Sequence, residues 1–284
     1  MSEMQSIQWF PGHMTKTKRK IAESLKLIDI VAEIVDARVP QSSRNPDLDD
    51  LVLSKPRIII LNKSDMADPN KTREWIDFYK KQNIFAISVD CKSGKGVNLF
   101  VPTIKNILKE KIEKAKIRGI NKSLKVMIVG VPNVGKSSFI NRLSSGKKAK
   151  VEDRPGVTRG NQWFTISKDV ELLDTPGVLW PKFEDMSVGE KLAFTGAIKD
   201  QIMDVEQLAV RLLEYLNENY RANLVQRYKL ENFELSEKSG AELLEIIGKK
   251  RGMLVSGGEI DTERVSIMLL DEFRSAKLGR ITLD

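Results

Sequence analysis

One phosphate-binding motif constrains the fold of this chain more than any other feature. Residues 130–137 read Gly-Val-Pro-Asn-Val-Gly-Lys-Ser and match the Gly-x4-Gly-Lys-Ser pattern in full. The strand-like run Lys125–Val129 precedes the motif and the helix-like run Ser137–Leu143 follows it, as the motif requires. Gly130 and Gly135 permit a tight loop whose N–H groups point at phosphate oxygens. The sequence therefore predicts a P-loop nucleotide-binding domain.

A base-recognition motif precedes this loop in the chain. Residues 62–65, Asn-Lys-Ser-Asp, come directly after the apolar run Arg57–Leu61. The Asp65 carboxylate can accept hydrogen bonds from the ring N–H and the exocyclic amine of guanine, whereas adenine would leave this carboxylate unpaired. We expect Asn62 to brace neighbouring loops and the Lys63 stem to lie over the base. An ordinary polar turn would have the same composition, but the position after a strand in a P-loop chain favours guanine recognition.

A metal-site motif comes last. Residues 174–177, Asp-Thr-Pro-Gly, follow another apolar run, and we expect Asp174 to hold Mg²⁺ through water and the Gly177 N–H to sense the γ-phosphate. Thr158, at the end of an Arg-Pro-Gly-Val-Thr segment, is the expected second hydroxyl ligand of the metal, beside the Ser137 hydroxyl. The sequence thus supplies an oxygen ligand set for Mg²⁺.

The remaining nucleotide contacts follow from the same motifs. Lys136 is expected to bridge the β- and γ-phosphates. Residues 88–90, Ser-Val-Asp, stand where a backbone N–H should contact the guanine oxygen, although the usual Ser-Ala-Lys is not present. The predicted GTP-binding residues are Asn62, Lys63, Asp65, Ser88, Val89, Asn133, Val134, Gly135, Lys136, Ser137, Ser138, Thr158 and Gly177.

The order of these motifs is inverted. In an ordinary GTPase the phosphate loop opens the domain and the guanine loop closes it, whereas here the guanine loop comes first and the metal turn last. Such a permutation keeps the pocket but relocates the chain ends, and so changes which segment the nucleotide state can move. We therefore predict a circularly permuted P-loop GTPase domain.

Alternating strand and helix patterns predict an α/β domain with a mostly parallel sheet. The predicted strands are Ile28–Val35, Arg57–Leu61, Ile84–Ile87, Lys125–Val129, Gln162–Ile166 and Val170–Leu173, and the predicted helices of this domain are Lys71–Gln82, Val101–Arg118 and Ser137–Leu143.

Only helical periodicity remains after about residue 181. Ser187 with Glu190, and Ser239 with Glu242, form candidate capping boxes that would satisfy the N–H groups of a first helical turn. The predicted helices are Asp204–Tyr220, Ala241–Gly248 and Thr262–Lys277. We therefore divide the chain into an N-terminal aromatic and basic arm (1–20), the permuted GTPase domain (21–181) and a small all-α domain (185–284).

The net charge is unevenly placed. Residues 1–184 hold 33 Lys and Arg against 21 Asp and Glu, or +12, whereas residues 185–284 hold 14 against 18, or −4. The segment Lys105–Lys125 alone contains eight basic and two acidic residues. Such a patch attracts polyanions, although a solvated helix face has the same composition. The lone Cys91 and the lack of any long apolar run predict a soluble cytoplasmic protein with no membrane partner.

The permuted order and two further motifs carry a resemblance to a known family. Residues 8–14 read Gln-Trp-Phe-Pro-Gly-His-Met, and residues 36–40 read Asp-Ala-Arg-Val-Pro. With these motifs the chain closely resembles the bacterial ribosome biogenesis GTPase A family over its whole length. The resemblance implies hydrolysis of GTP late in assembly of the large ribosomal subunit, with rRNA and ribosomal proteins of that particle as partners. We expect a monomer when the protein is free.

Two features of catalysis depend on this resemblance. Many GTPases place a water-orienting glutamine directly after the metal turn, but this chain has Val178 there. The resemblance points to His13, the only histidine, as the substitute, while contact with RNA phosphate or ordering of the arm is the alternative. Asn133 matches an asparagine that holds K⁺ beside the phosphates in similar GTPases, while turn propensity explains it equally well.

Two functions of different classes remain open at this point. The leading one is an enzymatic timer that docks on an immature large subunit and is released by hydrolysis of GTP. The other is an rRNA-binding scaffold in which the nucleotide is a structural ligand. Because only residues 178–181 separate the metal turn from the helical part, we expect loss of the γ-phosphate to move residues 185–284.

Overall fold

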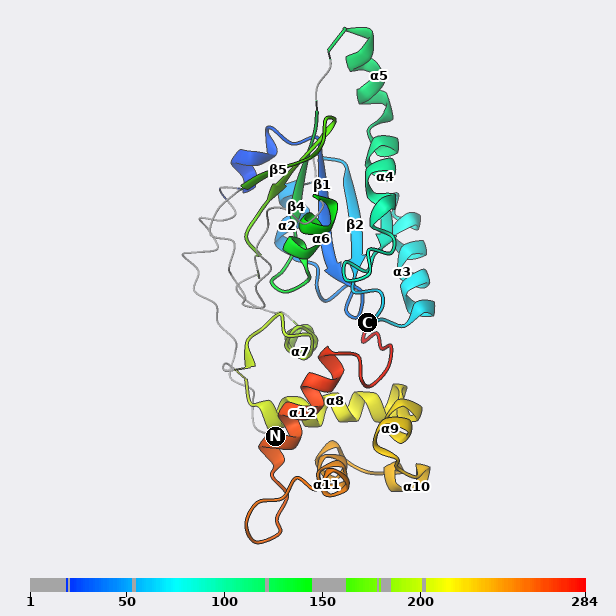
Figure 1. Cartoon of the computed structure of the whole chain (residues 1–284), viewed down its shortest axis with the longest axis vertical. Helices are drawn as coiled ribbons and strands as arrows, with labels where there is room; N and C mark the ends of the chain where they lie inside the picture. The colour runs from blue at the N-terminus through cyan, green and yellow to red at the C-terminus, as the bar shows by residue number, and fades with distance from the viewer. Residues whose placement is uncertain are drawn as a thin grey trace. The chain divides into compact units, whose positions relative to one another are not determined.

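Six strands form the sheet around which the first part of the chain folds (Figure 1). The chain separates into two compact units, of which one ends at Val188 and also includes Thr282–Asp284, and the other spans Gly189–Ile281. Within the described part, no helix is both long and apolar enough to cross a bilayer. The computed structural model describes residues 19, 21–52, 55–120, 123–144, 162–177, 179, 185–200 and 203–284.

The sheet has the order β3-β2-β1-β4-β6-β5, and every pair is parallel except β5 with β6. This confirms the predicted α/β class with a mostly parallel sheet. The central strand β1 is buried along its whole length, as expected of a strand covered on both faces. The strands are β1 (Ile30–Asp36), β2 (Arg57–Asn62), β3 (Phe85–Ser88), β4 (Leu124–Val129), β5 (Gln162–Ser167) and β6 (Val170–Asp174).

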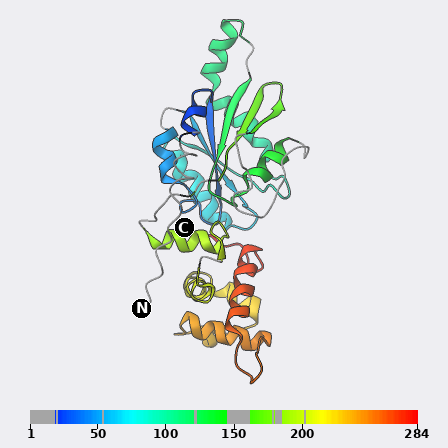
Figure 2. The same cartoon turned by 90° about the vertical axis from the view of Figure 1, so that its left-hand side faces the viewer.

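Helices lie on both sides of this sheet (Figures 1 and 2). Val31 and Val35 share one face of β1, because side chains alternate along a strand, and there they pack with Leu48 and Tyr79 respectively. Each fully buried aliphatic side chain of this kind contributes roughly 1.5–3 kcal/mol. Residues 21–25 are helical, and the helices of this unit with defined bounds are α2 (Pro46–Val52), α3 (Pro69–Lys81), α4 (Phe100–Ile107), α5 (Lys109–Ile117) and α6 (Lys136–Leu143), with a short 3₁₀ turn at Val97–Leu99.

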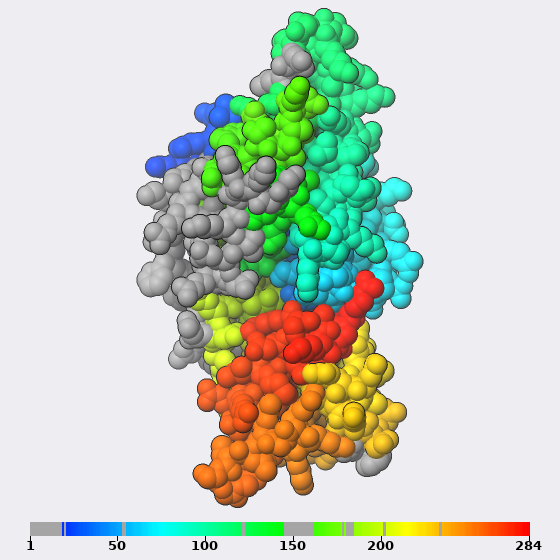
Figure 3. Space-filling model, viewed as in Figure 1, coloured from blue at the N-terminus to red at the C-terminus, as the bar shows by residue number. Residues whose placement is uncertain are grey.

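The single helix predicted over Val101–Arg118 is divided in the structure. Leu108, with φ −97° and ψ 14°, leaves helical geometry between α4 and α5. Leu108 is buried, whereas no residue of α5 is, so the break marks where the chain leaves the domain body. The exposed helix α5 carries the basic face that the sequence indicated, and it stands at the surface in Figure 3.

The second unit is entirely helical apart from one isolated bridge between Leu254 and Ile260, among the residues described. Its core is built where α8, α11 and α12 pack together. Gly240 is required at the start of α11, because a Cβ there would lie 2.3 Å from the Val210 carbonyl oxygen. The helices are α7 (Met186–Phe194, which spans the boundary), α8 (Val205–Asn219), α9 (Arg221–Tyr228), α10 (Asn232–Leu235), α11 (Gly240–Arg251) and α12 (Thr262–Arg274).

The two predicted capping boxes have different outcomes. The box at Ser239 and Glu242 is confirmed, with both reciprocal hydrogen bonds present at the start of α11. The box at Ser187 is wrong, because α7 already begins at Met186 and the Ser187 N–H donates to the Asp185 carboxylate (2.8 Å). Aspartate caps a helix as well as serine does, so the sequence alone could not show whether Asp185 or Ser187 precedes the helix.

One predicted domain boundary also differs. The sequence assigned residues 282–284 to the helical domain, but they lie in the first unit. The reason is a set of hydrogen bonds from these residues to the loop after β1, including Leu283 N–H to Arg38 O at 2.7 Å.

Candidate nucleotide-binding site

The sheet topology gathers all the sequence motifs at one edge. The carboxyl ends of parallel strands lie on the same side of a sheet, and ligands of open α/β sheets bind outside those ends. The phosphate loop follows β4, the guanine loop follows β2, and the metal turn follows β6. Strand β1 lies between β2 and β4, so the loop after Asp36 lies between the guanine loop and the phosphate loop.

Glycine is required at both ends of the phosphate loop. Gly130 has φ +148°, and a Cβ at this position would lie 2.4 Å from the Ile34 carbonyl oxygen of β1. Gly135, with φ +96°, is the N-cap of α6, whose first-turn N–H groups face the carboxyl edge of the sheet. A helix N-terminus after a glycine-rich loop is a site where backbone N–H groups and the helix dipole favour phosphate.

Lys136 is buried inside this loop. Its Nζ donates to the carbonyl oxygens of Gly130 (3.1 Å) and Val131 (2.9 Å). Burial lowers the pKa of Lys136 to about 8, and the nearby Asp174 carboxylate opposes this shift. A phosphate anion beside the ammonium group would favour its charged form and so raise this pKa.

Asn62 joins the guanine loop to the phosphate loop. Its Nδ2 donates to the Val134 carbonyl oxygen at 2.7 Å, and the side chain is 2% exposed. This is the bracing expected of Asn62. The two loops are so close that a Cβ on Gly135 would lie 2.3 Å from the Asn62 Nδ2. The Asn62 side chain therefore links the guanine loop directly to the phosphate loop.

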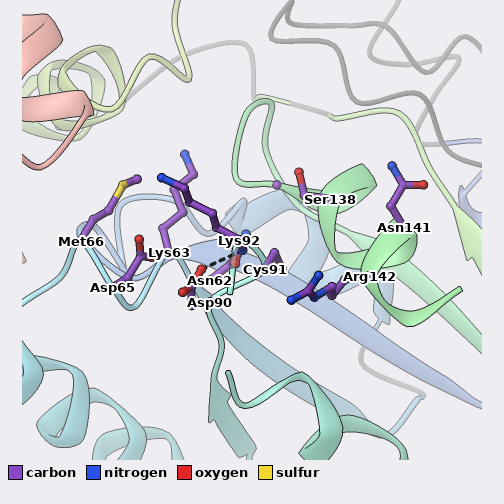
Figure 4. A pocket seen from close by; sticks show the side chains of 11 residues that line it. Asn62, Lys63, Asp65, Met66, Asp90, Cys91, Lys92, Ser138, Asn141 and Arg142 are labelled. Carbon is purple, nitrogen blue, oxygen red and sulfur yellow. Dashed lines mark hydrogen bonds between the residues drawn. The ribbon is translucent and has the colours of Figure 1, made fainter. Parts of the chain in front are cut away.

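A pocket of about 840 Å³ opens beside these loops (Figure 4). This volume is within the range of about 300–1,000 Å³ that small-molecule sites occupy. Lys63, Asp65 and Met66 lie on one side of the view, and Ser138, Asn141 and Arg142 of α6 lie on the other. The lining residues are Asn62, Lys63, Asp65, Met66, Asp90, Cys91, Lys92, Gly135, Ser138, Asn141 and Arg142.

The residues of the loop after β3 that line this pocket lie further along the chain than predicted. Val89 is buried, and its N–H donates to the Leu61 carbonyl oxygen (2.9 Å). Asp90, Cys91 and Lys92 line the pocket instead of Ser88 and Val89. The Asp90 carboxylate turns this loop by accepting from the Lys92 N–H at 2.8 Å.

Arg142 lines the pocket but was not among the predicted site residues. It projects from the last turn of α6 and donates to the Ser93 carbonyl oxygen, which ties α6 to the loop after β3. Its sequence signal is weak: Arg142 lies six residues after Lys136, on the helix that follows the P-loop, and a solvent-exposed arginine is common at such a position.

The metal turn packs against the phosphate loop. The Thr175 hydroxyl donates to the Ile128 carbonyl oxygen of β4 (2.7 Å), which fixes the turn to the strand that carries the loop. A Cβ on Gly177 would lie 2.8 Å from the Lys136 Nζ and 2.9 Å from the Pro132 N. Asp174 is 3% exposed at the end of β6. The predicted Asp174, Gly177 and Lys136 are thus brought together.

The donor chemistry of this corner fits Mg²⁺. Asp174 offers a carboxylate and Ser137, in the first turn of α6, offers a hydroxyl, and Mg²⁺ prefers such hard oxygen ligands. The close approach of Gly177 to Lys136 leaves no room for a side chain between the turn and the loop. Two predicted site residues, His13 and Thr158, lie outside the described residues, and so does Val178, which stands at the position of the missing glutamine.

A buried ionic cluster holds the lysine of the guanine loop. The Asp36 carboxylate accepts from Arg38 Nε (2.9 Å) and Nη2 (2.7 Å), and the Lys63 Nζ lies 3.0 Å from its Oδ2. Burial alone would raise the pKa of Asp36, but Arg38 and Lys63 outweigh this and hold the pKa well below its usual range. The Asp-Ala-Arg motif therefore holds the lysine of the guanine loop.

Asn133 has a left-handed backbone with φ +60°. Asparagine tolerates this conformation better than most residues, so the turn reading of Asn133 has a structural basis. A role as K⁺ ligand stays a prediction.

Comparisons with known proteins identify the class of protein that has this fold. A family model described as 50S ribosome-binding GTPase matches residues 125–242, which begins at the P-loop strand and excludes the earlier guanine loop. A GDP-bound YlqF structure has 28% sequence identity and a TM-score of 0.67, covering 94% of this chain and 98% of that one. The GNP-bound YlqF from Thermotoga maritima has 29% identity and a TM-score of 0.65, covering 95% and 97%. Fold and site together define a circularly permuted P-loop GTPase.

The sequence relatives narrow this class to one family. Ribosome biogenesis GTPase A of Priestia megaterium is 50% identical over 281 residues, which is 98% of this chain and 96% of the relative. The chain belongs to the ribosome biogenesis GTPase A family.

Proposed function

We propose that this GTPase binds the immature large ribosomal subunit and uses hydrolysis of GTP to time its own release during late maturation. The observation that supports this most is the convergence of phosphate loop, metal turn and guanine loop at one sheet edge, in a chain whose relatives are named ribosome biogenesis GTPases. The presence of phosphate, metal and guanine motifs in one chain favours a timer over a protein that binds nucleotide only for structure.

GTP binding divides between the two halves of the pocket. The N–H groups of the loop and of the α6 N-terminus take the phosphates, and Lys136 turns from its loop carbonyls toward the β- and γ-oxygens. Asp65 accepts from the guanine ring N–H and amine. When bound, Mg²⁺ would neutralise charge on the phosphate oxygens, held by Asp174, Ser137 and Thr158. The Gly177 N–H reports whether the γ-phosphate is present.

Water activation is assigned to His13. Because the residue after the metal turn is Val178, which neither donates nor accepts, the attacking water needs another partner. An imidazole orients or deprotonates water near neutral pH. The test is His13→Ala, with subunit binding and turnover per bound complex measured separately. Normal turnover per complex with weakened binding would assign His13 to RNA contact instead.

A monovalent ion is the second catalytic proposal. Asn133 lies in the phosphate loop, where its side chain would place K⁺ beside the phosphates and add positive charge in the transition state. Hydrolysis should then be faster in K⁺ than in Na⁺ at equal ionic strength. Equal rates would leave Asn133 with its turn role alone.

The partners follow from charge. The basic face of α5 and the lysines of the N-terminal arm are suited to rRNA phosphates, and neighbouring ribosomal proteins complete the docking surface. A scaffold function, in which turnover is incidental, would use the same surface.

Occupancy on the particle separates the two functions. Immature large subunits are sedimented with the protein in a non-hydrolysable GTP analogue, in GTP and in GDP. A timer stays bound with the analogue and is released in GTP and GDP. Equal occupancy in all three states would favour the scaffold.

A further inference from the structure

The last residues described form a segment that grips the loop after β1. The Asp284 carboxylate accepts from the N–H groups of Gln41 (2.8 Å) and Ser42 (2.8 Å) and from the Ser42 hydroxyl (2.7 Å). The Leu283 N–H donates to the Arg38 carbonyl oxygen at 2.7 Å. Leu283 is 3% exposed, so the segment is packed as well as hydrogen-bonded.

Thr282 connects the same segment to the end of the guanine loop. Its Oγ1 accepts from the Asp68 N–H (3.1 Å) and donates to the Ala37 carbonyl oxygen (3.4 Å), and the residue is 1% exposed. Asp68 is the N-cap of α3, and only two residues separate it from Asp65. One side chain therefore joins the loop after β1 to the loop that carries Asp65.

The gripped loop is the one that orients Lys63. Arg38 and Asp36 stand at its start, and the Asp36 carboxylate lies 3.0 Å from the Lys63 Nζ. The Asp36 N–H in turn donates to the Ser43 hydroxyl at 3.0 Å, next to the Ser42 that Asp284 holds. A displacement of residues 282–284 would thus reach both Lys63 and the Asp65 loop.

We propose that Thr282–Asp284 act as a strap that holds the guanine-recognition loop in its binding conformation, so that release of the strap weakens recognition of the base. The inference rests on the proposed guanine site and extends it to a regulatory contact. Thr282 and Asp284 are positioning residues, since neither lines the pocket.

Chain connectivity gives the strap its role. The helical unit leaves the nucleotide unit at Val188, shortly after the metal turn, and the chain returns at Thr282. The helical unit is thus connected at one end to the γ-phosphate sensor and at the other to the base-recognition loop. Because coupling between sites is reciprocal, a partner that binds the helical unit and loosens the strap must lower nucleotide affinity.

The test uses the full chain and mant-GDP. Thr282→Val keeps the side-chain volume but removes the hydroxyl, and Asp284→Ala removes the carboxylate. Each variant should release mant-GDP about fivefold faster, the ratio that corresponds to loss of one net hydrogen bond. Thr103→Val and Asp169→Ala are the matched controls, because the Thr103 hydroxyl donates to the Leu99 carbonyl oxygen just before α4 and Asp169 pairs with Lys105, away from the guanine loop.

A second readout separates positioning from general stability. Inosine diphosphate shares the phosphates of GDP but lacks the exocyclic amine from which Asp65 accepts a hydrogen bond. The ratio of the affinities for GDP and inosine diphosphate therefore reports on the guanine loop alone. This ratio should fall in Thr282→Val and Asp284→Ala, remain normal in the controls, and recover in part in Asp284→Asn, which retains one acceptor oxygen. If Asp284→Ala does not fold, Thr282→Val and Ser42→Ala give the same comparison.

An unchanged release rate and ratio in folded variants, with normal binding by the unaltered chain, would overturn the strap alone. Absence of mant-GDP binding by the unaltered chain would overturn the proposed nucleotide site, and the strap with it.

Discussion

Replacement of Gly135 by alanine tests the joint between the two halves of the pocket. Gly135 has φ +96°, and a left-handed backbone costs an L-residue about 1–2 kcal/mol. The added Cβ would also lie 2.3 Å from the Asn62 Nδ2, so Asn62 must move and release the Val134 carbonyl oxygen. A buried group left unsatisfied costs about 1–3 kcal/mol, which brings the expected total to about 2–5 kcal/mol.

Gly119→Ala is the matched control. Gly119 has a similar left-handed φ of +65°, but nothing lies within 4 Å of a Cβ there, so only the backbone cost of about 1–2 kcal/mol should appear. Urea unfolding followed by tryptophan fluorescence measures both variants, since Trp75 and Trp163 lie in the nucleotide unit. Gly135→Ala should also bind GDP at least roughly tenfold more weakly, while Gly119→Ala should bind normally.

A double-mutant cycle isolates the contact with Asn62. In an Asn62→Ala background the clash partner is absent, so Gly135→Ala should cost only its backbone strain. An equal cost of Gly135→Ala with and without Asn62, or equal effects of Gly135→Ala and Gly119→Ala, would refute the reasoning.

Three further outcomes follow from contacts elsewhere in the chain. Burial raises the pKa of the Cys91 thiol to about 12, so at pH 8 iodoacetamide should alkylate the folded protein at least roughly 100-fold more slowly than the urea-unfolded chain; comparable rates would contradict this. Ser239→Ala removes the capping box of α11 and should lower the free energy of unfolding by about 1 kcal/mol in urea titration. The control Ser236→Ala, at an exposed position, should leave the free energy of unfolding unchanged. Glu272→Gln weakens the buried acceptor of Arg227 and Tyr228 and should raise hydrogen exchange in α9 and α12; unchanged exchange in both helices would contradict this role.

Much of the fold was predictable because the strands of a doubly covered parallel sheet are continuous apolar runs. The apolar runs that form β1, β2 and β4 each lead directly into a motif, so strand ends and functional motifs could be placed together at the carboxyl edge of the sheet. The phosphate loop and Asn62 were predictable for the same reason. Their residue types are dictated by backbone geometry and by the ligand.

The remainder depends on contacts distant in the chain. The tie between Asp284 and Ser42 spans 242 residues, and neither residue type announces a partner. The cluster of Asp36, Arg38 and Lys63 likewise forms only because β1 and β2 are neighbours. The break at Leu108 escaped prediction because the apolar periodicity continues across it, while burial stops there. Tertiary environment, rather than local propensity, decides such features.

The central claim is that this site hydrolyses GTP and that the ribosomal particle controls the rate. Multiple-turnover hydrolysis of GTP, measured with and without large ribosomal subunits and with Lys136→Ala as the inactive control, tests it most directly. Because Val178 provides no group to orient water, we predict slow turnover by the protein alone and a marked acceleration by the subunits, both abolished in Lys136→Ala. Turnover that the subunits leave unchanged, or that survives the loss of Lys136, would contradict the account.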